Sequence, residues 1–328
     1  MERFKNILLY VSESVDPEPA MRRAVTLAIE NEASLTVVDV LPVSSEGPWL
    51  ILAGRPELVE AAAAAREFEL RNLVPPIQEH GVPVETRVLV GRPFLEIIRR
   101  VLLNGHDLVV LNAEAKEGGP GQALGRTALH LLRECPCPVW VIKRGEYGPH
   151  RRVLAAVDAG EDWSEQQQES LRVLRLAKSV AESDDSELRI AYCLGHWTSN
   201  YSVRWLTSAL GSHHHRLDEL LAKCDLSGVR HDVRLEREAA VDVIAALCAE
   251  VDVLVMGTIW RSGPAGVLIA DTAEDALARV DCSVLAVKPE GLITPIRFSE
   301  RPSSRSSVVT WRASYMRTLR WIGLRKVS

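Results

Sequence analysis

A run of three histidines is the most conspicuous group of side chains in the sequence that could do chemistry. His213, His214 and His215 precede Asp218 and Glu219 within a predicted helix. Residues three and four apart share a helix face, so His214 with Asp218, or His215 with Glu219, could hold a metal ion. Two or three ligands do not complete a site, and a solvated polar helix face explains the pattern better. We predict no metal site here, and the alternative is a regulatory Zn²⁺ site.

A second group is Cys135-Pro-Cys137, which lies directly before a predicted strand. The chain has 6 cysteines, without the repeated C-x-x-C pairs of a zinc site or the spacing of a disulfide framework. The prolines hold the segment away from the geometry of a redox loop, and free cysteines are commonly buried. We predict that these cysteines are reduced and structural.

The sequence lacks the common catalytic motifs. It contains no G-x-S-x-G elbow, no H-E-x-x-H helix and no G-x-x-x-x-G-K-[ST] loop. No pair of carboxylates stands out for acid–base catalysis. We therefore predict that the protein is not an enzyme.

Hydrophobic periodicity predicts the elements that must position any functional residue. Short β-branched runs alternate with longer amphipathic stretches, which is typical of parallel strands joined by crossover helices. Nearly continuous apolar strands indicate a doubly wound sheet that is covered on both faces. In the first half the predicted strands are Ile7–Val11, Leu35–Val40, Val84–Val90, Leu108–Leu111 and Val139–Ile142, and the predicted helices are Ala20–Glu30, Pro56–His80, Phe94–Leu103 and Thr127–Glu134.

The second half of the chain repeats this order of elements. Lys143 corresponds to Lys288 at an offset of 145, and Ile7 corresponds to Val153 at an offset of 146. A repeat of this size indicates tandem globular domains. The predicted strands are Val153–Val157, Leu188–Cys193, Val233–Leu235, Val253–Met256 and Val284–Val287, with helices near Gln166–Ala181, His213–Ala222, Val241–Ala249 and Ala273–Arg279.

The predicted organisation is two tandem α/β domains and a tail. Each domain is expected to be Rossmann-like, with a five-stranded parallel sheet, over residues 1–145 and 151–297. The polar segment near Arg144–Arg151 is the predicted linker. An apolar N-terminal run of about five residues is too short for a signal peptide, and no run reaches the roughly 20 residues that span a bilayer. We expect a soluble, cytoplasmic protein.

The tail, residues 298–328, differs in charge from the two domains. Seven basic residues against Glu300 give it a net charge of +6, which leaves −11 on residues 1–297 because the whole chain carries −5. From Val308 onward, apolar residues recur at helical spacing among arginines. Such a segment could bind an anionic membrane or nucleic acid, fold back on the acidic body, or stay disordered, and these alternatives remain open.

Four short stretches carry a family resemblance. They are Gly91-Arg-Pro-Phe94, the segment His130–Trp140, Asp271-Thr-Ala-Glu274 and Val287-Lys-Pro289. In sequence and order they resemble the universal stress protein family in its tandem form, over about residues 1–297. The resemblance implies the Rossmann-like fold, a role in the stress response, and two repeats packed side by side as a pseudo-dimer. A homodimer and a separate protein partner are further alternatives.

The same resemblance identifies a candidate nucleotide loop in the first half. Nucleotide-binding members of the family carry an Asp after the first strand and a G-x2-G-x9-G-[ST] loop after the fourth. Glycines let the backbone approach phosphates, and the following helix N-terminus favours anions. The matching residues here are Asn112, Ala115, Gly125 and Arg126, with Ser12 in place of the Asp. Because one glycine of three is kept, we predict a degenerate loop.

The loop of the second half departs from the family pattern in different ways. Its matching residues are Gly257, Trp260, Ala270 and Asp271, although Asp158 does follow the first strand. An indole at Trp260 would fill space that phosphates need. The carboxylate of Asp271 would repel a polyphosphate electrostatically, and a simpler interpretation is that Asp271 is the N-cap of the following helix. This loop is also predicted to be degenerate.

We predict that the second half is the one that binds a small ligand. The candidate ligand-binding residues are Asp158, Gly257, Thr258, Trp260, Asp271 and Thr272. The leading interpretation is a non-catalytic binding protein of the stress response without an established cofactor. The alternative is ATP binding with slow hydrolysis, through Asp158, Gly257 and Thr258, with a metal ion compensating Asp271.

Overall fold

The structure is a computed structural model in which both halves of the chain form α/β units. It describes residues 4–42, 55–115, 122–143, 150–158, 163–193, 203–236, 240–257, 277, 280–289, 292, 294 and 296. The first half contains the strands β1 (Asn6–Tyr10), β2 (Ser34–Pro42), β3 (Val84–Gly91), β4 (Leu108–Asn112) and β7 (Val139–Ile142), the helices α1 (Glu18–Asn31), α3 (Pro56–Asn72), α4 (Val74–Gln78), α5 (Pro93–Asn104) and α6 (Arg126–Glu134), and a short hairpin of β5 (Glu114–Ala115) and β6 (Gln122–Ala123).

The second half repeats these elements in the same order. Its strands are β8 (Arg152–Asp158), β9 (Glu187–Cys193), β10 (His231–Glu236), β11 (Val253–Gly257) and β12 (Ser283–Val287), and its helices are α7 (Trp163–Ser183), α8 (Val203–Ala222) and α9 (Ala240–Cys248). The helix predicted near Ala273–Arg279 and the tail lie outside the described residues, apart from Leu277. The helix predicted over His213–Ala222 begins earlier, at Val203.

One predicted helix is wrong. The segment Pro56–His80 forms two helices, α3 and α4, rather than one. Pro75 and Pro76 have no N–H to donate and clash with a preceding helical turn, so the long helix cannot continue through them. They are tolerated in the first turn of α4, where N–H groups lack intrahelical acceptors anyway.

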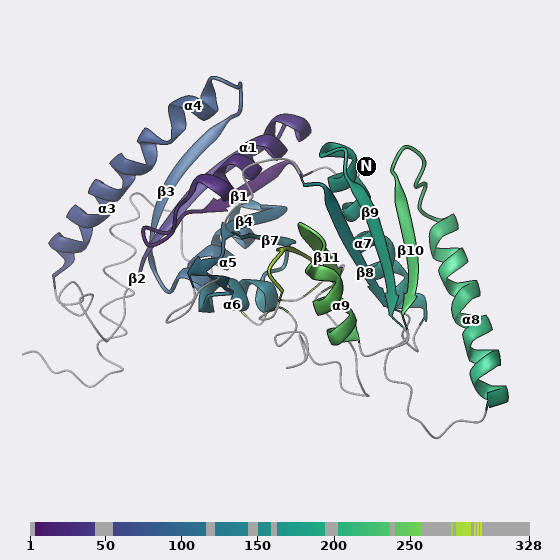
Figure 1. Ribbon diagram of the computed structural model, residues 1–328. Coiled ribbons are helices and arrows are strands. Elements are labelled where there is room, and N and C mark those ends of the chain that lie inside the picture. The colour runs from purple at the N-terminus through teal and green to yellow at the C-terminus, as the bar shows by residue number, and fades with distance from the viewer. Residues whose placement is uncertain are drawn as a thin grey trace, which may run out of the picture.

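All ten main strands lie in one sheet, in the order β10-β9-β8-β11-β12-β7-β4-β1-β2-β3. Within each half the neighbouring strands are parallel. Each half thus has the doubly wound order expected of a Rossmann-like domain, so the predicted fold class is confirmed. Figure 1 shows α3 and α4 at one end of the molecule and α8 at the other, with the two halves meeting at β7.

The halves join through an antiparallel pair of strands at the middle of the sheet. Trp140 of β7 is opposite Leu285 of β12, and these residues are 145 positions apart, the offset found in the sequence. This one pair of equivalent residues places a pseudo-twofold axis between Trp140 and Leu285. We call the β7–β12 pair, together with the helices α1, α6 and α7 that pack on it, the seam.

The repeat extends to individual hydrogen bonds at the start of the sheet. The Asp107 carboxylate accepts from the backbone N–H groups of Lys5 and Asn6 at 2.6 and 3.0 Å. The Asp252 carboxylate accepts from Arg151 and Arg152 at 2.7 and 3.0 Å. The two halves therefore use the same contact to align their first strand beside the loop before their fourth.

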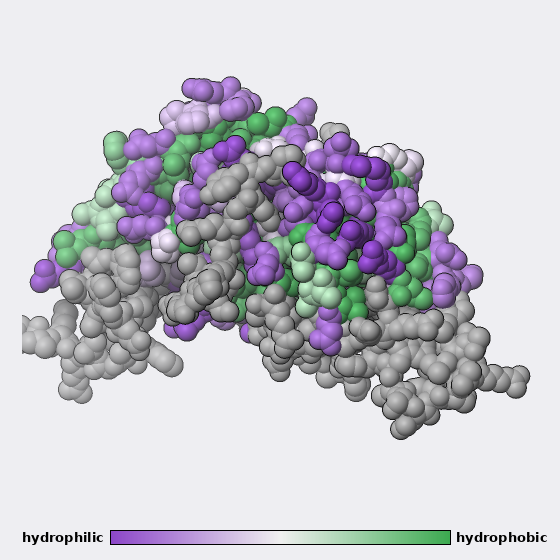
Figure 2. Space-filling model, viewed as in Figure 1, coloured by the Kyte–Doolittle hydropathy of each residue, from purple (hydrophilic) through white to green (hydrophobic). Residues whose placement is uncertain are grey.

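The hydrophobic core continues across the seam on both faces of the sheet. On one face, α1, α4, α7 and α8 bury their apolar sides in a single cluster that includes Trp140. On the other, α5, α6 and α9 do the same around Val141 and Val284. On the face that Figure 2 shows, the described residues form hydrophilic areas with hydrophobic areas among them. Among the described residues, no helix combines the length and apolar character needed to cross a membrane.

Candidate functional site

Each half has a topological switch point, where the order of its strands reverses. In the first half it lies between β1 and β4, and in the second between β8 and β11. Ligands of open α/β sheets bind at such points, outside the carboxyl ends of the strands. The candidate residues of both halves lie at or near these two edges.

In the first half, Asn112 joins the two loops that border the switch point. Its side-chain oxygen accepts from the Ala20 backbone N–H at 3.0 Å, and its amide nitrogen donates to the Asp16 carbonyl at 2.9 Å. This residue stands where the family pattern has a glycine. The Asn112 side chain therefore ties the start of α1 to the end of β4, across the place where a ligand would enter.

The Glu114 carboxylate lies against Gly125, the one glycine of the family pattern that this loop keeps. Gly125 precedes α6, and a Cβ added to Gly125 would clash with the Glu114 carboxylate. The first N–H groups of a helix and its dipole favour an anion. The carboxylate of Glu114 therefore lies where a phosphate of a bound nucleotide would be expected.

The surroundings of this edge are acidic as well. Burial and the nearby carboxylates of Asp39 and Glu114 raise the pKa of Tyr10 to about 12, against a smaller opposing effect of Ser12 and Arg66. Burial also raises the pKa of Asp39, although the guanidinium of Arg66 opposes that rise. An added polyphosphate would meet negative charge here.

In the second half, Asp158 and Gly257 lie at the same edge of the sheet. They end the neighbouring parallel strands β8 and β11, which pair up to Met256 opposite Ala156. The Glu169 carboxylate of α7 lies against Gly257, and a Cβ added there would be 2.5 Å from its Oε1 atom. Thr258, Trp260, Asp271 and Thr272, and with them the rest of this loop, lie outside the described residues.

His213 and His215 contact different partners. The His213 ring meets the Tyr192 ring edge-on at 6.2 Å, and burial lowers the pKa of His213. His215 faces Glu219 at 3.4 Å on the exposed side of α8. Within the described residues, no three His, Cys, Asp or Glu side chains are placed to hold a metal ion together.

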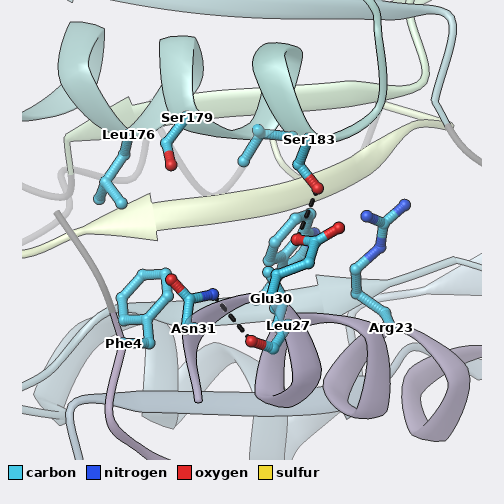
Figure 3. Close-up of a pocket in the computed structure, with 10 residues that line it drawn as sticks. Phe4, Arg23, Leu27, Glu30, Asn31, Leu176, Ser179 and Ser183 are labelled. Carbon is cyan, nitrogen blue, oxygen red and sulfur yellow. Dashed lines mark hydrogen bonds between the residues drawn. The ribbon is translucent and has the colours of Figure 1, made fainter. Parts of the chain in front are cut away.

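A small cavity of about 110 Å³ lies at the seam between α1 and α7. Figure 3 shows Leu176, Ser179 and Ser183 of α7 facing Leu27, Glu30 and Asn31 of α1. Ser183 donates to the Glu30 carboxylate at 2.7 Å and so bridges the two helices. The volume is enough for a few water molecules and too small for a nucleotide.

Behind this cavity, buried charges connect the repeats. Arg23 of α1 is paired with Asp184 at 3.0 Å and lies 2.8 Å from the His150 ring. Its guanidinium also stacks over Trp140 at 5.3 Å. These contacts are structural, because they fasten α1 of one repeat to the end of α7 in the other.

The comparisons with known proteins agree with the duplicated fold. The model of the universal stress protein family matches residues 3–143 and again residues 149–288. The chain belongs to the universal stress protein family. Its members are proteins of the stress response, and this chain carries the family unit twice.

Among curated relatives, the chain is similar to universal stress protein E. It is 25% identical to that protein of Escherichia coli strain K12 over 322 residues, which cover 92% of this chain and 99% of the relative. It is 24% identical to universal stress protein E of Photorhabdus laumondii over 312 residues, covering 90% and 99%.

Solved structures show the same fold. A putative universal stress protein from Pseudomonas aeruginosa UCBPP-PA14 has a TM-score of 0.67 and 21% identity, covering 88% of this chain and 94% of that one. A universal stress protein from Archaeoglobus fulgidus DSM 4304 has a TM-score of 0.60 and 18% identity, covering 87% and 98%. At these identities the similarity concerns the fold alone.

Proposed function

We propose that this tandem universal stress protein is non-catalytic and acts in the cytoplasm by binding, with nucleotide loops that no longer accept a polyphosphate. One observation carries the proposal. In each half a carboxylate of the protein lies against the surviving loop glycine, Glu114 against Gly125 and Glu169 against Gly257. Sequence comparison alone could not locate these two side chains.

The size of the electrostatic effect supports this reading. Two unit charges 4 Å apart repel by about 4 kcal/mol at the effective dielectric constant of a protein surface. Micromolar affinity corresponds to about 8 kcal/mol, so one such repulsion removes about three powers of ten in affinity. A ligand with several phosphate charges loses more.

The second half is the proposed ligand-binding half. Asp158 and Gly257 lie together at its switch point, whereas Asn112 ties the corresponding loops of the first half together. Carboxylates at this edge favour a small ligand that offers hydrogen-bond donors or positive charge. The full candidate set remains Asp158, Gly257, Thr258, Trp260, Asp271 and Thr272.

ATP binding in the second half is the second candidate function. The observation that favours it is the Glu169 carboxylate against Gly257, at the edge where Asp158 ends the neighbouring strand β8, because a divalent cation could bridge a carboxylate and phosphates. The cation would then convert a repulsive edge into a binding one.

Isothermal titration calorimetry on the full chain separates the two functions. We expect no heat with millimolar ATP, with or without Mg²⁺ or Zn²⁺. Micromolar binding that requires the cation would instead establish the second function and overturn the first.

A substitution at Glu169 tests the physical reason. Glu169→Gln keeps the shape and removes the charge, so weak ATP binding should appear, with affinity raised roughly a thousandfold if about 4 kcal/mol of repulsion is lost. Glu182→Gln, on the same helix beside Lys178, is the matched control and should change nothing. Equal behaviour of the two variants would show that Glu169 does not exclude phosphate.

A further inference from the structure

Two cysteine thiols meet in the interior at the beginning of β7. The Cys135 and Cys137 sulfur atoms are 3.6 Å apart. Cys135 is completely buried, and Cys137 keeps 7% of its surface exposed. A disulfide bond is about 2.05 Å long, so the two sulfurs would approach by about 1.5 Å to form one.

A lysine from the other repeat completes this cluster. Lys288 follows β12, is 2% exposed, and donates from its Nζ atom to the Leu132 carbonyl of α6. Burial lowers the pKa of Lys288 to about 8, although the two thiols and Glu169 oppose that change. The amine of Lys288 is therefore buried near two sulfurs inside the protein.

This lysine acts on the thiols electrostatically. Burial opposes ionisation of Cys135, but hydrogen bonds from the Cys137 side chain and backbone and the charge of Lys288 outweigh it and lower the pKa of Cys135. The pKa of Cys137 is raised by its hydrogen bond with Cys135 and by burial. These shifts favour the thiolate at Cys135 and the protonated thiol at Cys137.

The other end of the seam repeats the arrangement with different elements. Lys143 follows β7 and donates from its Nζ atom to the Val280 carbonyl. Cys282 is equivalent to Cys137 at the offset of 145, and its thiol is hydrogen-bonded to Cys248 of α9. A buried pair of thiols beside a lysine of the opposite repeat is thus a property of the seam.

We propose that Cys135 and Cys137 form an oxidation site that reduces a hydroperoxide and closes a disulfide, with Lys288 as a positioning residue. The Cys135 thiolate attacks the O–O bond, which gives a sulfenic acid and, after protonation, an alcohol or water. The Cys137 sulfur then displaces hydroxide from Cys135, and its proton leaves with the hydroxide as water. Two thiols and one hydroperoxide yield one disulfide, one alcohol and one water.

The site lies at the ligand edge of the second repeat. Lys288 follows the carboxyl end of β12, next to the end of β11 where Gly257 lies. Glu169 acts electrostatically on Lys288 and also lies against Gly257. Oxidation in the first repeat would therefore change the electrostatic surroundings of the proposed ligand-binding edge in the second repeat. This link, unlike the oxidation site itself, rests on the proposed function.

Peptide mapping of the full chain tests the oxidation site directly. The reduced protein is treated with hydrogen peroxide in slight excess, alkylated and digested with trypsin, which cleaves after Arg133 and Lys143 and keeps both cysteines on one peptide. We expect this peptide to lose two hydrogens and resist alkylation. Cys224 is an internal control, because it is also buried and burial raises its pKa, so it should stay reduced and be alkylated once the protein is denatured.

Two variants distinguish this chemistry from a structural role. Cys137→Ser should stop at a sulfenic acid on Cys135 that a dimedone probe captures. Lys288→Met keeps the apolar stem and removes the charge that lowers the pKa of Cys135, so oxidation should slow roughly tenfold for each unit by which that pKa rises. Thermal unfolding identifies variants that fail to fold.

The outcomes that overturn the proposal are specific. The protein is folded during the peroxide treatment and denatured before alkylation, and full alkylation of both cysteines would then overturn the proposal, as would oxidation of Cys224 at the same rate. Because the readout is the disulfide itself, a failure of ATP or ligand binding leaves this test unaffected.

Discussion

Asp184 is the residue whose charge fastens the two repeats most directly. Its carboxylate accepts from Arg23 at 3.0 Å and lies 2.5 Å from the His150 ring nitrogen. Burial opposes its ionisation, but the hydrogen bonds and positive charge of His150 and Arg23 outweigh it, so its pKa falls from 3.8 to about 2. Folding therefore favours the ionised form.

The pH dependence of stability follows from this shift. Since the folded pKa lies below the unfolded value, the contribution, about 2 kcal/mol, is present above about pH 4 and is lost as the pH falls towards 2. Urea unfolding at several pH values should show a weaker acid dependence for Asp184→Asn than for the wild type. Asp185→Asn is the matched control, because Asn tolerates its positive φ of 51°. Identical acid dependence in all three proteins would contradict the prediction.

At the scale of elements, α1 and α5 both end at a left-handed residue. Glu32 ends α1 with φ 52°, and Gly105 ends α5 with φ 65°. A Cβ at Gly105 would meet no atom within 4 Å. A substitution there would therefore change stability only through the strain of the left-handed backbone conformation.

These two helix ends predict opposite changes in stability. Gly105→Ala should lower the free energy of unfolding by about 1 kcal/mol, and Glu32→Gly should raise it by up to about 1 kcal/mol, because only glycine adopts this conformation without strain. Thermal or urea unfolding of the two variants measures both. Changes of the same sign would disagree with the assigned backbone conformations.

The elements could be predicted from sequence because their signals are local. The strands of both halves are short apolar runs with turn formers on either side. Their observed ends therefore differ from the predicted ends by at most two residues. The prediction of one helix over Pro56–His80 was wrong because it followed the hydrophobic pattern and gave too little weight to Pro75 and Pro76. The proline rule would have divided it correctly.

The candidate site could be predicted less well, because its chemistry depends on residues distant in sequence. Asn112 was recognised as a departure from the loop pattern, yet its bonds to Asp16 and Ala20 need the fold. Glu169 belongs to a helix that no loop motif includes, so no local signal connects it with Gly257. Only the meeting of α7 with the end of β11 does so.

At the scale of the whole molecule, the seam makes each repeat depend on the other. The predicted boundaries, residues 1–145, 151–297 and 298–328, place β7 and β12 in different domains, although these strands pair with each other. Separation would leave both edges unpaired and would expose Trp140.

Expression of the halves tests these boundaries. Residues 1–145 alone should self-associate through β7, and co-expression with residues 151–297 should restore a one-to-one complex, as measured by analytical ultracentrifugation. A first half that stays monomeric and folded by itself would contradict this dependence.

The antiparallel seam also determines where the two repeats present their ligand edges. Strands of one half run opposite to those of the other, so the carboxyl ends of β1 and β4 point away from those of β8 and β11. A molecule at one edge is thus out of reach of the other. Under the proposed function, Asn112 closes one edge while the other stays open, so one repeat can lose ligand binding without affecting the other.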